Sequence, residues 1–498
     1  MYDDMTRDSG SDIRRISGGA TVARNTAVLL GGQVLAQAIS VVLGIFITRV
    51  LGAAEYGKYV SAFAFAVLFM SFASMGLDKM LVREMSRRPG EASQLVRDAA
   101  VVRLVLSLGV YLAMIAGTYV LRYTPGQRQT ALLAGLVTEM ASLADFLRGV
   151  CRAFERMELD VLSRVLERVA AAVFAAAVLL RWRTATAVVM ALALANAVAL
   201  VSAMLFAQRF VHVRGRPSAR AALSLFQMAV PFGIGSIAVN LVTRLDAFFL
   251  SLLRPAVEVG SYGAATNIVL PFAMLPQAFS SSLFPRLSRE AERDTDFVRR
   301  ACALSVKWTV AAALPIAAAL IGLADVAVLT VLGTTYGSSI VPLRILASGL
   351  VLIFANTVVS NVLSALGQQS IVTVVVVVYV VLTVVLCSAL IPRLGISGAA
   401  LAVVLRDLFG FVTMLFALSR SKLFSPWRSL AGTLASGALM FVALFLLRAA
   451  NPIWRVAGPI ATYVLALLVT GSLGAADWRI AQDLLRTWGT GRRRAVLR

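Results

Sequence analysis

Long apolar stretches recur along the whole chain of 498 residues, separated by short polar segments. Each stretch runs for about 20 residues, which is enough for an α-helix to cross a ~30 Å hydrocarbon layer. The pattern predicts an all-α polytopic membrane protein with about fourteen transmembrane helices, at residues 26–48, 60–78, 99–121, 130–150, 162–180, 185–207, 223–252, 259–284, 302–322, 341–366, 371–391, 396–418, 429–447 and 457–475.

The composition agrees with this pattern. Hydrophobic residues make up 59% of the chain and charged residues only 14%, and the mean hydropathy is +0.84. A soluble protein of this length needs a charged surface that this chain lacks. The first apolar stretch is long enough to span, so we expect an uncleaved first helix rather than a removed signal peptide.

The net charge of +22 first suggests a nucleic-acid partner, but its distribution favours a topological explanation. Of the 47 Lys and Arg residues, 31 fall in segments on the side of the N-terminus and 10 in segments on the other side. By the positive-inside rule, this asymmetry predicts a protein of the cytoplasmic (inner) membrane with both termini cytoplasmic. We therefore expect membrane lipids, and no nucleic acid, as partners of the basic segments.

Two similar stretches indicate an internal repeat. EYGKYVSA at 55–62 returns as EVGSYGAA at 258–265, and the basic residues Arg83 and Arg97 correspond to Arg286 and Arg300 at the same offset of 203. Six helices return the chain to its starting side, so the two halves run in the same direction. We expect two pseudo-symmetric six-helix bundles related by an axis along the membrane normal. The alternative is that Gly and Tyr simply suit an interfacial turn.

The repeat gives a domain layout for the whole chain. It consists of a cytoplasmic N-terminal segment, a first bundle, a cytoplasmic linker, a second bundle, two additional helices and a basic cytoplasmic tail, at residues 1–24, 25–210, 211–222, 223–418, 419–475 and 476–498. The prolines at 231, 271, 276 and 315 lie inside the seventh to ninth spans, and the first six spans contain none. Because proline bends a helix, these spans are where the second bundle flexes or where it carries static kinks.

No constellation typical of an enzyme stands out. The sequence has no G-x-x-x-x-G-K-[ST] phosphate loop and no clustered Cys and His with metal spacing. Short outer loops leave little room for an active site on that side. We therefore expect a carrier rather than an enzyme, with no catalytic residue, no metal and no cofactor.

Charges inside the spans are the candidate functional residues, because an ionisable group at the bilayer centre costs ~2.5–3.5 kcal/mol. Arg244 and Asp246 lie deep in the apolar run 239–250. At 3.6 residues per turn they are about 200° apart, so they do not pair unless the helix is broken. One is expected to face the seam between the bundles and the other to find a partner on a neighbouring helix.

A second group lies on the fourth span. Glu139, Asp145 and Arg148 are close in sequence, and the last two are spaced i, i+3 on one helical face. Arg344, Arg406 and Asp407 are further charges within spans. Arginines along a transport path suit a phosphorylated substrate, since guanidinium grips phosphate oxygens bidentately. The alternative is that these charges pair to fix helix packing, or extend to a nearby surface.

Several stretches resemble a known family. They are RVLGAAEYGKY at 49–59, GLDKMLVRE at 76–84, RLDAFFLSLL at 244–253, EVGSYGAATNI at 258–268, FPRLSR at 284–289 and LGISGAALAVVL at 394–405. Together with the helix count, the chain resembles the bacterial polysaccharide flippases of the Wzx type. These belong to the superfamily that also holds the multidrug extruders and the lipid II flippase.

The resemblance implies a V-shaped pair of bundles that rock between inward-open and outward-open states. It implies a lipid-diphosphate-linked oligosaccharide as substrate, with glycan polymerases and glycosyltransferases as candidate partners. Position within the spans nominates Arg244, Asp246, Arg148 and Arg344 as substrate-binding residues. Arg49 is a further candidate because it matches the family's Arg before Leu-Gly, near the outer end of the first span. By their position within the spans, Asp246, Glu139 and Asp145 are the candidates for a coupling ion, H⁺ or Na⁺.

Three other functions fit the same sequence. A multidrug or cation antiporter of the same superfamily would want carboxylates in the cavity, whereas arginines are at least as prominent here. A polymerase or ligase acting on lipid-linked glycans is disfavoured by the short outer loops. A scaffold for a glycan assembly complex would tolerate loss of every buried charge.

Overall fold

The computed structural model describes residues 5–212, 216–277, 295–420, 426–470 and 472. All regular elements of these residues are helices, and nine of the helices are long and apolar enough to cross a membrane. This confirms the predicted fold class. The basic tail 476–498, most of the 285–300 loop and parts of 1–24 and 211–222 lie outside the described residues, and the domain layout stays a prediction.

The first half of the chain forms α1 (Met5–Ser74), α2 (Leu77–Arg87), η1 (Pro89–Glu91), α3 (Ala92–Val120), α4 (Pro125–Ala153), α5 (Met157–Arg181) and α6 (Ala185–Ala207). The second half forms α7 (Ala219–Val242), α8 (Leu245–Leu253), α9 (Ala256–Val269), η2 (Phe272–Met274), α11 (Thr295–Gly322), α12 (Ala324–Val326), η3 (Ala327–Leu332), η4 (Thr334–Ser339), α13 (Ile340–Ala365) and α14 (Gln369–Arg420). Two further helices follow, α15 (Pro426–Leu446) and α16 (Pro452–Val469).

Two glycines let single helices hold two predicted spans each. Gly52 bends α1 with φ 70° and ψ 168°, and Gly395 bends α14 with φ 59° and ψ −135°. Only glycine adopts such angles at little cost. The end of the molecule at which α1 bends is called the Gly52 end, and the opposite end, where α1 gives way to α2, the Gly76 end.

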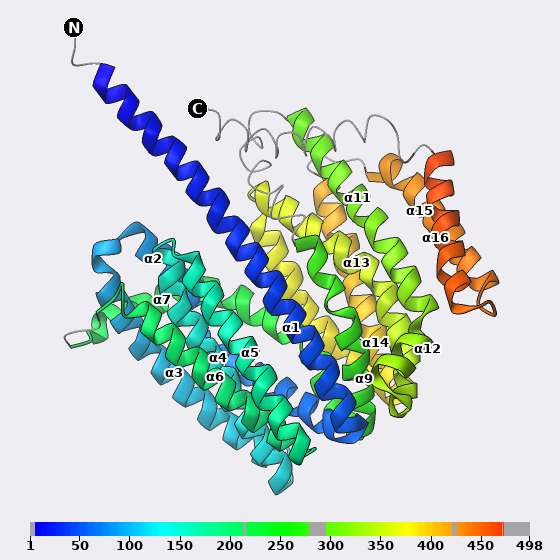
Figure 1. The fold of residues 1–498 in the computed structure, drawn as a ribbon, viewed down its shortest axis with the longest axis horizontal. Helices are drawn as coiled ribbons and strands as arrows, with labels where there is room; N and C mark the ends of the chain where they lie inside the picture. Colours follow the sequence, from blue (N-terminus) through cyan, green and yellow to red (C-terminus); the bar gives the residue numbers. More distant parts are fainter. Residues whose placement is uncertain (1–4, 213–215, 278–294, 421–425, 471, 473–498) are drawn as a thin grey trace.

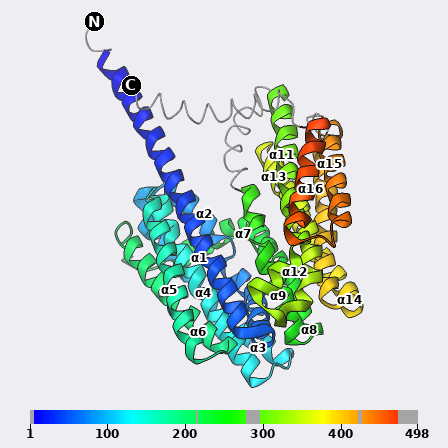
Figure 2. The same cartoon turned by 45° about the vertical axis from the view of Figure 1, so that its right-hand side comes forward.

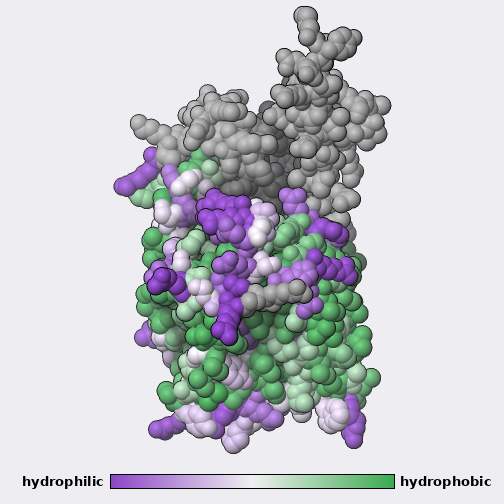
Figure 3. Space-filling view, turned by 90° about the vertical axis from the view of Figure 1, so that its left-hand side faces the viewer, coloured by the Kyte–Doolittle hydropathy of each residue, from purple (hydrophilic) through white to green (hydrophobic). Residues whose placement is uncertain are grey.

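The helices form two groups, with α1 running between them (Figures 1 and 2). The helices α2 to α6 lie in one group, and α9, α11, α13 and α14 lie in the other, with α15 and α16 on its flank. A broad apolar band covers the face in Figure 3. On α3, Leu104, Leu108 and Leu112 are exposed at 71%, 61% and 57%, a helical stripe that suits contact with lipid rather than water.

The halves meet at a reciprocal contact of two glycines. A Cβ atom at Gly57 would lie 1.7 Å from the carbonyl oxygen of Ala256, and one at Gly260 would lie 1.9 Å from that of Ala53. Both pairs of equivalent positions differ by the offset of 203. The backbones of α1 and α9 can approach this closely only because no side chain intervenes. This reciprocal approach is the contact expected of two halves that repeat at this offset.

The helix α7 starts the second half but also packs on the first. Leu225 and Ala229 share a buried core with Leu77 and Val150. At the Gly76 end, a Cβ atom at Gly76 would lie 2.4 Å from the backbone nitrogen of Gly233. The helix therefore contacts both halves, since its remainder packs against α14.

Candidate functional site

The seventh predicted span, 223–252, is interrupted by a break in its helix. The helix α7 ends at Val242 and α8 begins at Leu245, with Thr243 and Arg244 between them. The amide of Arg244 still donates to the carbonyl of Leu241 (3.1 Å), in a tighter turn than the α-helix makes. Arg244 therefore lies in the break, and Asp246 lies in the first turn of α8.

Arg244 and Asp246 face different surroundings, as their spacing predicts. Asp246 is buried and accepts a hydrogen bond from the hydroxyl of Tyr262 on α9. Arg244 is exposed and lies close enough to the hydroxyls of Tyr56 and Tyr59 on α1 to interact with them electrostatically. Arg244 of the second half therefore lies near two tyrosines of the first.

A second arginine reaches the same place from the first half. Arg168 on α5 is exposed and also interacts electrostatically with the Tyr59 hydroxyl, while its guanidinium lies 3.5 Å from the carboxylate of Glu167. The residues Tyr56, Tyr59, Arg168 and Arg244 are called the Tyr59 site below. Sequence reasoning missed Arg168 because it placed 151–168 in a loop, whereas α5 begins at Met157. The i, i+4 spacing of charges at Asp160, Arg164 and Arg168 could have shown the helix.

Hydrogen bonds join the halves near this site. The amide nitrogen Nδ2 of Asn267 on α9 donates to the Tyr56 hydroxyl (2.9 Å) and to Oγ1 of Thr48 (3.3 Å). The hydroxyl of Tyr336 donates to the carbonyl of Thr48 (2.6 Å). These contacts hold the halves together at Tyr56 of the site and at Thr48, nearer the Gly52 end.

Arg148, a predicted substrate-binding residue, is engaged within the first half. Its Nη1 atom lies 2.9 Å from Oε2 of Glu167, and its Nε atom lies 3.8 Å from Oδ1 of Asp145. Arg148 is only 3% exposed. The pair joins α4 to α5, so the structure places Arg148 among the packing contacts of these helices.

The two carboxylates predicted on α4 are engaged in the same way. Asp145 lies 2.6 Å from Nη2 of Arg164 and 3.1 Å from Nη2 of Arg152. Glu139 accepts from Nε of Arg103 (3.3 Å) and from the hydroxyl of Ser107 (2.6 Å).

Sequence reasoning did not select Arg103 as a candidate. Its side chain is 1% exposed, and its Nη1 atom also lies 3.7 Å from the carboxylate of Asp78 on α2. The sequence feature that could have identified it is a single arginine inside the apolar run VVRLVLSLGV. The ion pairs of Arg103 connect α2, α3 and α4.

The structure does not bring Arg49 and Arg344 to the Tyr59 site. Arg49 is exposed near the Gly52 end, with its Nη1 atom 3.4 Å from the carbonyl of Thr330. Arg344 is exposed in the first turns of α13, near the same end.

Arg406 and Asp407 meet the interrupted helix from α14. Arg406 Nη2 lies 2.9 Å from Asp407 Oδ1, and its Nη1 atom donates to the carbonyl of Val242 (3.2 Å). The guanidinium also lies 5.5 Å from the ring centre of Tyr379. The end of α7 is thus held by a charge that is 164 residues away.

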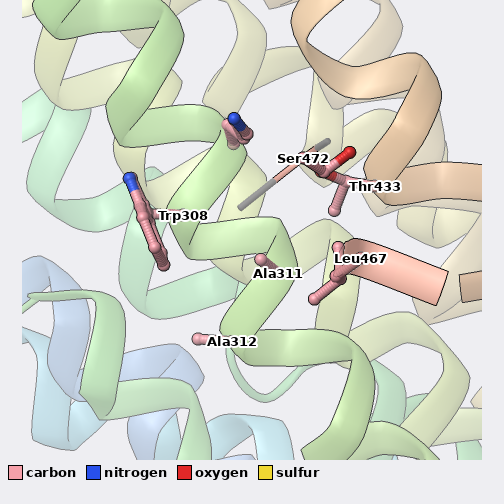
Figure 4. A pocket seen from close by; sticks show the side chains of 7 residues that line it. Trp308, Ala311, Ala312, Thr433, Leu467 and Ser472 are labelled. Carbon is pink, nitrogen blue, oxygen red and sulfur yellow. The ribbon is translucent and has the colours of Figure 1, made fainter. Parts of the chain in front are cut away.

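A cavity of about 210 Å³ lies between α11, α15 and α16 (Figure 4). Its lining residues are Lys307, Trp308, Ala311, Ala312, Thr433, Leu467 and Ser472. None of them belongs to the Tyr59 site.

Comparisons with known proteins agree with this geometry. The family described as "Polysaccharide biosynthesis protein" matches residues 22–290, which is more than half of the chain. The MatE family matches residues 231–388. The "Probable flippase AglR" of Haloferax volcanii is 24% identical over 443 residues, which cover 87% of this chain and 91% of that protein.

Solved structures share the fold. The lipid II flippase MurJ in an inward closed conformation superposes with a TM-score of 0.69 at 13% identity, covering 89% of this chain and 98% of MurJ. An inward-facing multidrug resistance MATE transporter of the MOP superfamily gives a TM-score of 0.64 at 15% identity, covering 78% of this chain and 95% of that protein. The family match, the paired halves and the shared fold lead to one conclusion: this chain belongs to the polysaccharide biosynthesis protein family and has the fold of the MOP-superfamily transporters.

Proposed function

We propose that this protein is a flippase for surface polysaccharide biosynthesis. It moves an undecaprenyl-diphosphate-linked oligosaccharide repeat unit from the inner to the outer leaflet of the cytoplasmic membrane. The observation that supports this best is the exposed Arg244 at the break between α7 and α8, with Arg168 of the other half near the same tyrosine. In the proposed cycle the two halves separate in turn at the Gly76 end and at the Gly52 end.

The depth of Arg244 supports a role in transport. It lies ten residues before Arg254 at the Gly52 end, which is about 15 Å along a helix and about half of a ~30 Å hydrocarbon layer. An exposed guanidinium at this depth is costly unless an anion or water accompanies it. A diphosphate that passes the Tyr59 site would offset this cost.

The chemistry of the Tyr59 site suits a diphosphate headgroup. Guanidinium groups bind phosphate oxygens in bidentate fashion, and here they come from both halves. Tyrosine hydroxyls add hydrogen-bond donors. The lipid tail stays in the membrane while the sugars and the diphosphate move along the seam. Binding that bridges Arg168 and Arg244 would favour the state in which the halves are close, which is how a substrate shifts such an equilibrium.

Two of the similar proteins support the flippase function, and one family match supports an alternative. The similar Haloferax protein carries the name "Probable flippase", and the lipid II flippase shares the fold. The MatE match over 231–388 favours a second candidate, a multidrug or cation antiporter. That function would use an accessible carboxylate, whereas Asp246 next to the break is buried against Tyr262.

The test uses a strain that lacks the gene, complemented with variants. We expect the deletion to accumulate lipid-linked oligosaccharide in the inner leaflet and to lose surface polysaccharide. The wild-type gene and the exposed control variant Arg393→Ala should restore both, and Arg244→Ala should restore neither at an equal level in the membrane. Normal complementation by Arg244→Ala would exclude Arg244 from the site.

Other outcomes of the same test exclude the function itself. An intact surface without accumulation in the deletion strain would leave cation or drug efflux as the leading function. Single repeat units that accumulate in the outer leaflet would indicate a later, enzymatic step.

A further inference from the structure

The carbonyls at the end of α7 are all engaged, although the helix stops inside the membrane. An interrupted helix leaves its last carbonyls without intrahelical partners, and in lipid such groups must be satisfied by other protein groups. The amide and the hydroxyl of Thr243 donate to the carbonyls of Val239 (3.3 Å) and Asn240 (2.7 Å). The carbonyl of Val242 receives its hydrogen bond from the guanidinium of Arg406 (3.2 Å).

Breaks of this kind are where transporters hold a mobile cation. The carboxyl end of a half-helix and its unwound carbonyls offer partial negative charge, and Na⁺ commonly binds there. Here Asp246 lies in the first turn of α8, and Asp407 is paired with the arginine that contacts the end of α7. Carboxylates and a backbone carbonyl are the oxygen ligands that a hard cation prefers.

The guanidinium of Arg406 already occupies this position. Its side chain is buried, pairs with Asp407 at 2.9 Å and interacts electrostatically with Asp246. The ring of Tyr379 covers it at 5.5 Å. Tyr379 precedes the bend at Gly395, and its ring can lie so close to the part of α14 after the bend only because Gly410 is there, since a Cβ atom at Gly410 would lie 1.5 Å from the Tyr379 hydroxyl.

We propose that Arg406 is a tethered cation in the place of a mobile coupling cation, so that Na⁺ does not bind at the α7–α8 break of the native protein. Arg406 positions the end of α7 through Val242 and neutralises Asp407. The end of the interrupted helix is therefore held in place without a bound Na⁺ ion. This inference concerns the ion and does not depend on which substrate the protein moves.

Thermal unfolding of the purified full-length protein in detergent tests this directly. The melting temperature Tm is measured in NaCl and in choline chloride at equal ionic strength, for wild type, Arg406→Met and Arg406→Lys. We expect the wild-type Tm to be the same in both salts. Arg406→Met should lose stability in choline chloride and regain at least half of the lost Tm in NaCl, because ligands that bind only the folded state stabilise it.

Two controls separate this effect from general salt stabilisation. Arg148→Met removes another buried arginine, paired with Glu167, and should lose Tm equally in both salts. Arg406→Lys keeps the cation and should not respond to Na⁺. A Na⁺-specific rise of the wild-type Tm, or an Arg406→Met variant that Na⁺ does not stabilise, would overturn the inference. Should Arg406→Met not fold, binding of radiolabelled Na⁺ to the wild-type protein is measured instead. Saturable Na⁺ binding that Arg406→Lys weakens would overturn the inference.

Discussion

The hydroxyl of Tyr336 donates a 2.6 Å hydrogen bond to the carbonyl oxygen of Thr48, 288 residues earlier in the chain. Tyr336 is fully buried in η4 of the second half, and Thr48 lies in α1 of the first, one turn before the bend at Gly52. The bond joins the halves where an alternating-access protein must separate them. Removal of this hydrogen bond should therefore change the populations of the inward-open and outward-open states more than it changes the stability of either half.

We predict that Tyr336→Phe favours the state in which the halves are apart at the Gly52 end. A net loss of about 1 kcal/mol for the hydrogen bond is about a fivefold change in the equilibrium. Spin labels at Arg183→Cys and Arg393→Cys, both exposed at this end, should show a larger population of long distances. Tyr111→Phe is the matched control, because its 3.1 Å bond to the carbonyl of Leu132 stays within the first half. Unchanged distances in Tyr336→Phe would contradict the prediction.

Alanine at Gly57 or Gly260 should destabilise the protein, and by similar amounts. Each new Cβ atom would meet a backbone carbonyl at less than 2 Å, and a backbone cannot rotate away as a side chain can. Thermal unfolding in detergent measures the loss. Gly109→Ala is the control, since nothing lies within 4 Å of that position, and it should be neutral or gain about 0.5–1 kcal/mol from helix propensity. Two very unequal losses would argue against the reciprocal contact.

Arg103→Met should destabilise the first half by about 3–5 kcal/mol, because it leaves the carboxylate of Glu139 buried without its cation. The double variant Arg103→Met with Glu139→Met should regain much of this stability, since neither charge remains. A double-mutant cycle on unfolding free energies gives the coupling. Losses that simply add would show that the 3.3 Å pair contributes little.

Labelling of introduced cysteines should place residues 79 and 289 on the cytoplasmic side and residue 129 on the other. A membrane-impermeant maleimide should label Gln129→Cys in intact cells, but label Lys79→Cys and Arg289→Cys only after permeabilisation. The native cysteines give little background because all three are buried and free, at residues 151, 302 and 387. Labelling of residues 79 and 289 from opposite sides would contradict the parallel repeat.

Much of the fold could be predicted from the sequence because a helix that crosses a lipid bilayer needs an apolar stretch of a fixed minimum length. Apolar length gave the spans, and the offset between Gly57 and Gly260 gave the relation between the halves. Both signals are local or periodic. The bends at Gly52 and Gly395 are compatible with the spans because they fall between two of them.

The candidate site was only partly predictable, because its contacts depend on distant residues. The opposite surroundings of Arg244 and Asp246 followed from their spacing. The break at Thr243 and Arg244 did not, since Tyr262 and Arg406 contact its two sides from other helices. Whether a buried charge forms an ion pair or is available to a ligand depends on its neighbours in space. Arg148, for example, pairs with Glu167 on another helix.

The contact of Gly57 with Gly260 also bears on how such a chain could arise. Each half presents to the other the same surface that it receives, which is the isologous contact of a homodimer with twofold symmetry. A protein of one half would pair with a second copy through this surface without any change to it. Fusion of the two copies into one chain keeps the contact and allows the sequences of the two halves to diverge. Arg244 has Val41 as its counterpart at the offset of 203, and Arg406 has Ala203, so the charges at the break belong to one half alone.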